Sequence, residues 1–222
     1  MLLLAFMAFS TDLNSLLKCE FAARDLEWEK AFFHAFAHGK LKVLNDTPVS
    51  GPDGWPYLVC EASNEGTEPT TKVLSWLSDK GIGLVVNPGK ETPDYVFSYG
   101  MIWNFRERGE FLTAQESQVK NEKVEFSKEQ KVLAGPPDEK YLPVYARHIL
   151  KSFFKDNGVT AMKILVMSED QKQFDLCFSI EALGRPAPEE HKGILEALSW
   201  FLPAHYSLLL ISEQGLPAFA EL

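Results

Sequence analysis

The amino-acid sequence predicts an α+β protein made of two small α/β domains, each a mixed sheet with helices packed on it. Apolar residues at helical spacing alternate with short apolar runs that are typical of strands. The order of these elements restarts after a charged stretch that is poor in aliphatic residues. We therefore expect an N-terminal domain over residues 1–112, a charged linker over 113–138 and a C-terminal domain over 139–222.

The first domain is organised around a short strand within residues 81–89 (GIGLVVNPG). Four aliphatic residues lie between a glycine-rich start and an Asn-Pro-Gly stop, which is typical of a strand with both faces covered. The preceding residues 70–80 carry Val73, Leu74, Trp76 and Leu77 at helical spacing, and a glycine follows them. Helix, tight turn and buried strand together indicate an α/β layer.

The elements before this unit follow from their apolar periodicity. Asp12 supplies a capping side chain for a helix over 13–23, and residues 26–38 continue as a second helix with an aromatic stripe. Residues 40–44 alternate polar and apolar side chains, as a strand with one covered face does. A turn-rich loop, a strand and an acidic loop follow at residues 45–56, 57–60 and 61–69.

Residues 95–105 (YVFSYGMIWNF) are rich in aromatic side chains and are predicted to be extended, with a bend at Gly100. Alternate aromatic rings then share one face, and two arginines follow. Because such residues are enriched at binding hot spots, this face is the candidate interaction surface, and the alternative is plain domain core. We favour the core for Trp103 and expect any exposed ring at Tyr95 or Phe105. The candidate residues are Tyr95, Tyr99, Trp103, Phe105, Arg106 and Arg108.

The second domain is predicted to contain a helix, two strands, a helix and a strand. The first helix begins near Tyr141 with Pro143 in its first turn, where proline is tolerated, and an Asn-Gly pair ends it. A polar turn over 168–173 joins the two strands into an antiparallel hairpin. These elements are expected at residues 141–156, 161–167, 174–180, 189–202 and 206–211.

The overall composition argues against some classes of protein. A formal net charge of −9 disfavours a sequence-independent nucleic-acid binder, which needs a basic surface facing the phosphates. Three widely spaced cysteines without a CxxC pair fit a reducing compartment, so we expect a cytoplasmic location. The apolar residues 1–9 have no basic residue before them and fall short of the roughly 20 residues that span a bilayer. We expect a buried segment there, or a start at Met7, and no membrane association.

Three local patterns look reactive but are better explained as structure. His34 and His38 have the spacing of zinc ligands on a helix, without a third ligand. Cys60 precedes a loop and a helix, as some nucleophilic thiolates do, but the loop carries glutamates and no arginine. Gly81 and Gly83 precede the strand, whereas a dinucleotide fingerprint follows one. The sequence therefore predicts no catalytic residue, no metal and no cofactor.

Several short stretches carry a resemblance to a known family. They are residues 14–17, 32–36, 41–44 and 81–89, together with Tyr141-Leu142-Pro143 opening a helix before a hairpin, a helix and a strand. This arrangement resembles the enhanced-serine-sensitivity (SseB) family of small bacterial proteins, which pair an N-terminal α/β domain with a smaller C-terminal one. The aromatic run and the long linker depart from that pattern. The resemblance implies a soluble bacterial protein with an interaction or accessory role.

We therefore expect a non-enzymatic cytoplasmic protein that acts through an unidentified protein partner. The alternative is an enzyme or small-ligand-binding protein that uses a cleft between the domains. A pocket between the domains with several polar side chains of shifted pKa favours the alternative, and a broad, shallow aromatic surface favours the partner.

Overall fold

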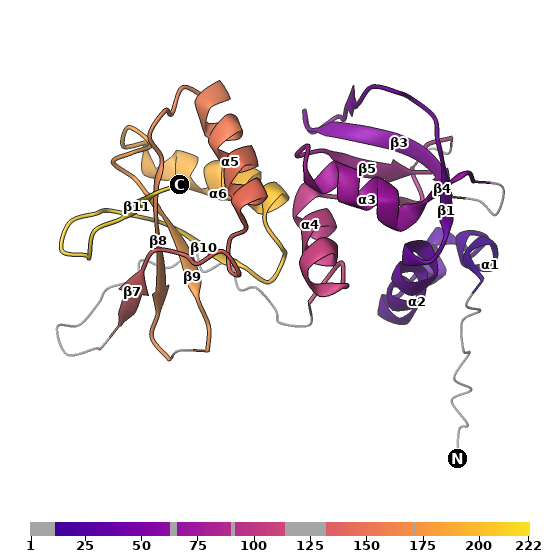
Figure 1. Ribbon diagram of the computed structural model, residues 1–222, viewed down its shortest axis with the longest axis horizontal. Helices are drawn as coiled ribbons and strands as arrows, with labels where there is room; N and C mark the ends of the chain where they lie inside the picture. The colour runs from indigo at the N-terminus through magenta and orange to yellow at the C-terminus, as the bar shows by residue number, and fades with distance from the viewer. Residues whose placement is uncertain (1–11, 63–65, 90–91, 114–131, 171) are drawn as a thin grey trace, which may run out of the picture.

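The computed structural model describes residues 12–62, 66–89, 92–113, 132–170 and 172–222. These residues form two units, each built on its own sheet, and the two units lie side by side (Figure 1). The predicted α+β class, with helices packed on two mixed sheets, is confirmed. No helix in these ranges is long and apolar enough to cross a bilayer. The predicted buried segment at residues 1–9 lies outside the described residues.

Helix α1 is shorter than the sequence predicts. It covers Leu13–Leu17 and begins at the predicted capping residue Asp12, but it does not continue to residue 23. The chain turns away because the Arg24 guanidinium donates to the carbonyl oxygens of Leu17 and Cys19. In a longer helix those carbonyls would accept from backbone amides one turn further along.

The first sheet has the strand order β4-β1-β3-β5-β6, with β2 paired to β3. Helix α3 (Thr70–Ser78) connects β3 to β5, which run parallel with Leu58 opposite Leu84. The other neighbouring strands are antiparallel. The strands are β1 (Lys40–Val43), β2 (Val49–Ser50), β3 (Pro56–Ala62), β4 (Glu68–Pro69), β5 (Gly83–Val86) and β6 (Tyr95–Phe97). A helix that connects parallel strands is the α/β unit expected around residues 81–89.

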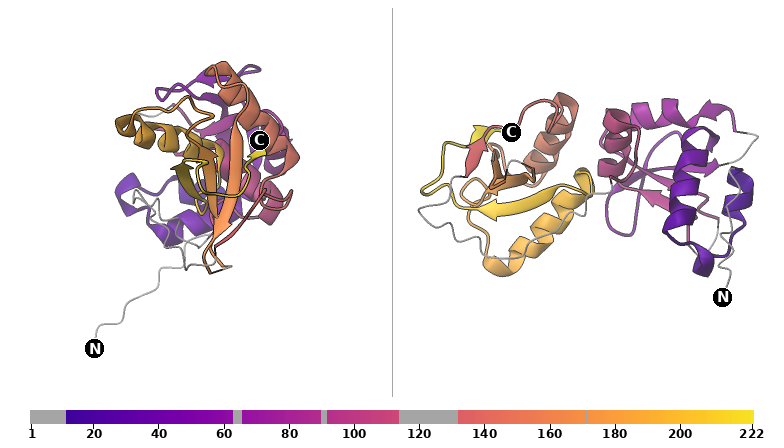
Figure 2. Two further views of the ribbon diagram at one scale, coloured as in Figure 1. Left: turned by 90° about the vertical axis from the view of Figure 1, so that its left-hand side faces the viewer. Right: turned by 90° about the horizontal axis from the view of Figure 1, so that it is seen from below.

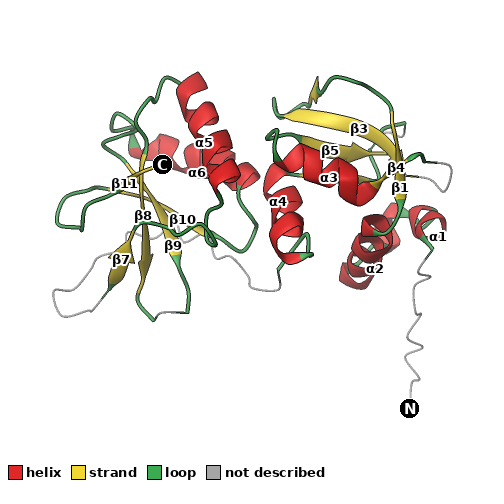
Figure 3. Ribbon diagram, in the orientation of Figure 1, coloured by secondary structure: helices red, strands yellow, loops and turns green. Residues whose placement is uncertain are grey.

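The helices of the first unit pack on one face of its sheet (Figure 3). Leu58 and Leu84 point from that face into a core shared with α2 (Leu26–Ala37) and α3. On the opposite face, Val85 is partly exposed and Val96 beside it is 41% exposed. The expectation that both faces of this strand are covered is therefore wrong for one face.

The largest departure from the sequence prediction is the stretch 95–105. The strand β6 ends at Phe97, and Tyr99–Arg108 form helix α4. Ser98 begins the helix, because its hydroxyl accepts a hydrogen bond from the backbone amide of Met101 at 3.3 Å. Gly109 ends it in the left-handed conformation, at φ 73°. The aromatic residues alternate as they do in a strand, but the apolar residues of this stretch also have helical spacing. The predicted extended conformation is therefore wrong for residues 99–105.

The second sheet has the strand order β10-β9-β8-β11, with β7 paired to β8. Strands β8 and β9 form the predicted antiparallel hairpin, and β10 runs parallel to β9 after helix α6 (His191–Phe201). Helix α5 (Val144–Asp156) begins directly after Pro143 and packs on this sheet. The strands are β7 (Leu133–Gly135), β8 (Lys163–Ser168), β9 (Asp175–Ser179), β10 (Ser207–Ile211) and β11 (Ala220–Glu221). Most of the predicted linker, 113–138, lies outside the described residues, and β7 belongs to its described part.

Helix α4 lies between the two units (Figure 2) and contributes side chains to the core of each. Ile102 belongs to the core of the first unit, whereas Tyr99 and Trp103 belong to the core of the second. The Trp103 indole N–H donates to the carbonyl of Phe201 at 2.7 Å. Gly100 allows this close approach, since a Cβ there would lie 2.0 Å from a backbone oxygen of the second unit.

Candidate functional site

The aromatic residues predicted as an interaction surface do not share an exposed face, because helix α4 turns them to different sides. Tyr99 and Trp103 are buried at the junction, as we favoured for Trp103. Tyr95 is partly buried, and its hydroxyl donates to Glu29 at 2.7 Å. Phe105 is partly buried against the first core. These four rings are thus engaged within the protein.

The two arginines of the predicted surface have different surroundings. Arg106 forms an ion pair with Asp79 at 2.5 Å, and its guanidinium carbon lies 4.3 Å from the centre of the Tyr145 ring. Arg108, at the end of α4, instead reaches a cavity between the two units. We take this junction cavity as the candidate functional site.

The junction cavity has a volume of about 480 Å³ and is lined by both units. Arg108 is the contribution of the first unit. The second unit contributes Val166 of strand β8 and residues of three connections. The loop before α5, the hairpin end and the connection from α6 to β10 supply Pro136, Pro137, Asp138, Lys140, Tyr141, Lys172, Phe174, His205 and Tyr206. Cavities of this size between structural units are common ligand sites.

The loop over residues 136–141 is fixed by hydrogen bonds from behind the cavity wall. The Arg147 guanidinium, on α5, donates to the carbonyls of Leu142 at 2.9 Å and Pro137 at 2.6 Å. The Tyr206 hydroxyl donates to the carbonyl of Tyr141, and the two rings stack with their centres 4.6 Å apart. Burial raises the pKa of both tyrosines, so their hydroxyl groups stay protonated at neutral pH. The wall is therefore preorganised.

His205 is the most unusual group of the cavity wall. Neither of its ring nitrogens is open to solvent, and neither has a hydrogen-bond partner within the part of the chain that the structure describes. Burial, assisted by the positive charge of Arg108, lowers its pKa to about 4. Unpaired buried polar groups cost folding free energy, so His205 is an energetically costly residue at this position.

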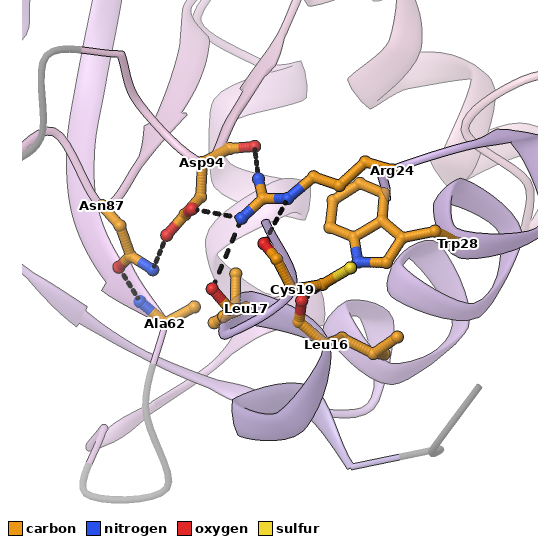
Figure 4. A network of polar contacts seen from close by, with 8 residues as sticks. All are labelled: Leu16, Leu17, Cys19, Arg24, Trp28, Ala62, Asn87 and Asp94. Atoms are coloured by element: carbon orange, nitrogen blue, oxygen red, sulfur yellow. Dashed lines mark hydrogen bonds and ion pairs between the residues drawn. The ribbon is translucent and has the colours of Figure 1, made fainter. Parts of the chain in front are cut away.

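A second cavity, of about 730 Å³, lies at the carboxyl ends of the parallel strands β3 and β5. Ligands of open α/β sheets bind at such edges. Asn87 follows β5 in the left-handed conformation, at φ 54°, and its side chain bridges the Ala62 amide and the Asp94 carboxylate (Figure 4). Asn is one of the few residues that adopt this conformation readily.

The polar groups around the second cavity are already paired with one another. Arg24 forms a buried ion pair with Asp94 at 2.7 Å, donates to the Leu17 and Cys19 carbonyls, and has its guanidinium carbon 4.6 Å from the centre of the Trp28 ring (Figure 4). An arginine with these partners has little donor capacity left for a ligand. The network therefore braces the α1–α2 connection against the sheet.

The other candidates keep the structural roles expected for them. His34 and His38 are both exposed at the end of α2, and no group of three potential metal ligands occurs among the described residues. Cys60 is fully buried, and burial raises its pKa to about 12, which leaves the thiol protonated.

Most of the junction cavity could not be predicted from the sequence. Tyr141, Lys172 and His205 come from three separate connections, and no local motif joins them. The one available signal was His205, a titratable residue directly before an apolar strand. Of the predicted site residues, only Arg108 lies in the cavity wall.

No family model, no curated protein and no solved structure matches this chain. The resemblance to the enhanced-serine-sensitivity family therefore stays a prediction.

Proposed function

We propose that this protein is a non-enzymatic binding protein that holds a small-molecule ligand in the junction cavity. The observation that carries the proposal is that one cavity is assembled from Arg108 of the first unit and from three connections of the second. A ligand there contacts both units, as ligands in cavities between structural units commonly do.

Binding is favoured over catalysis because the histidine and the two tyrosines of the cavity are poor acid–base catalysts at neutral pH. An efficient general base or acid has a pKa near the working pH. The pKa of His205 is lowered to about 4, and those of Tyr141 and Tyr206 are raised. These side chains instead give the cavity its shape and present fixed dipoles to a ligand.

The partner-binding role expected from the sequence has less support than ligand binding. It depended on aromatic rings that are buried or engaged within the protein, Tyr99 and Trp103 above all. The cytoplasmic location stays part of the proposal, and it is supported by Cys19, Cys60 and Cys177, none of which forms a disulfide. An accessory role in a bacterial cell rests on the family resemblance.

A fragment screen followed by NMR on the labelled full chain tests the proposal. Neutral, anionic and cationic fragments of one or two rings are added separately, and shifts are recorded for backbone amides and for the His205 ring. We expect shifts to concentrate at residues 136–141, 172–174 and 204–206. The proposal fails if no fragment shifts these signals at millimolar concentration, or if the shifts concentrate beside Asn87 at the second cavity.

A further inference from the structure

We infer that the ligand of the junction cavity is an organic anion, with a phosphate or carboxylate group joined to a planar apolar part. This inference rests on the proposed function and adds the chemical class of the ligand. Arg108, Lys140 and Lys172 line the cavity, and Asp138 is the one carboxylate among the lining residues. The excess of positive charge is notable in a chain with a net charge of −9.

The three cations of the cavity lack ion-pair partners. Elsewhere Lys72, Arg106 and Lys163 each have a carboxylate oxygen within 3.0 Å. No ion pair involves Arg108, Lys140 or Lys172 in the described ranges. Cations without an ion-pair partner that line one concave surface attract anions, and phosphate and carboxylate oxygens accept well from their N–H donors.

The carboxylate that lines the cavity, Asp138, accepts a hydrogen bond within its own loop. Asp138 Oδ1 accepts from the backbone amide of Tyr141 at 2.7 Å, and its carbonyl accepts from the Leu142 amide at 3.0 Å. These contacts shape the turn that leads into α5. Asp138 thus stabilises the loop that forms part of the cavity wall. Among the described residues it forms no ion pair with Arg108, Lys140 or Lys172, so these cations can still bind an anionic ligand.

Three aromatic side chains, Tyr141, Phe174 and Tyr206, also line the cavity. Tyr141 stacks on Tyr206, and the Phe174 ring meets Tyr141 edge-on, with its centre 6.2 Å away. Phe174 is 42% exposed, which is high for a phenylalanine beside a cavity. A planar apolar group placed against this ring buries surface that is now in water, and it leaves the anionic end near the cations.

Calorimetric titration of the full chain tests the inference with four probes: phenyl phosphate, inorganic phosphate, benzoate and benzyl alcohol. The site variant carries Lys140→Gln and Lys172→Gln. The control carries Lys151→Gln and Lys155→Gln, two exposed lysines of α5 that lie outside the cavity and remove the same charge.

At least one anionic probe is expected to bind, and the site variant should weaken it about tenfold or more because charge-assisted hydrogen bonds are lost. The control should change its affinity by about twofold at most, as for exposed charges. Raising the salt from about 10 mM to about 150 mM, which shortens the Debye length from about 30 Å to about 8 Å, should weaken anion binding and leave benzyl alcohol unaffected. Preference for phenyl phosphate or for benzoate identifies the anionic group.

Several outcomes overturn the inference. If benzyl alcohol binds as tightly as the anions and the site variant has no effect, the cavity binds ligands but does not select anions, and the proposed function survives. If inorganic phosphate binds as tightly as phenyl phosphate, the planar part of the ligand is wrong. If no probe binds, the inference fails, and the fragment screen alone then decides on the proposed function.

Discussion

Replacing Trp103 by alanine is expected to destabilise the fold through the junction. The indole is 2% exposed, it donates to the Phe201 carbonyl at 2.7 Å, and it meets the Tyr206 ring edge-on at 5.7 Å. Truncating a buried tryptophan costs about 3–5 kcal/mol. Because the substitution also leaves a buried carbonyl without its donor, we expect the upper part of that range. This is a large share of a typical stability of about 5–15 kcal/mol.

Urea unfolding followed by far-UV circular dichroism measures this loss. Trp76→Ala is the matched control, since Trp76 lies on helix α3 of the same unit but is 44% exposed. We expect the control to change the free energy of unfolding by about 1 kcal/mol or less. If Trp103→Ala costs as little as Trp76→Ala, Trp103 is not part of a packed junction. The cavity beside it would then lose its physical basis.

Three further predictions concern the junction, the brace and the cavity wall. Gly100→Ala should lower the melting temperature, because its Cβ would meet a backbone oxygen at 2.0 Å, whereas Gly193→Ala on α6 has open space and should raise stability by up to about 1 kcal/mol; equal effects would contradict the packing. Asp94→Asn should cost about 3–5 kcal/mol in denaturant unfolding, because it leaves buried Arg24 unpaired, while Glu27→Gln in an exposed pair should cost about 1 kcal/mol or less. His205 has a pKa of about 4 when folded against 6.5 ordinarily, so the unfolded chain binds the proton more readily between these values. Stability should therefore fall as the pH drops from 6.5 towards 4, and His205→Asn should lose part of this dependence in melting curves; an unchanged pH profile would show that His205 is not shielded.

Most of the helices and strands could be predicted from local sequence patterns, because the spacing of apolar residues shows which side chains of an element are buried. The helix at residues 26–38, the parallel strand at 83–86 and the hairpin of the second unit all follow apolar spacing and turn residues close by in the chain. Helix α4 was missed because its aromatic residues fit two periods. Ser98 and Gly109, its two end residues, carried the information that decides between them.

The candidate site could not be predicted in the same way. Arg108 and His205 are nearly a hundred residues apart in sequence, and only the packing of α4 against α6 brings their connections together. A stripe of helix that faces a second unit looks the same in sequence as one that faces its own core. The six predicted surface residues do not share one exposed face for that reason, since Tyr99 and Trp103 belong to the core of the second unit.

A crystal structure of the full chain soaked with phenyl phosphate tests the central claim most directly. We expect density for the phosphate beside Arg108, Lys140 or Lys172, with the phenyl ring against Tyr141 or Phe174 and both units in contact with the ligand. Density confined to another part of the surface, or a structure in which α4 does not pack on α6 and the cavity is absent, would contradict it.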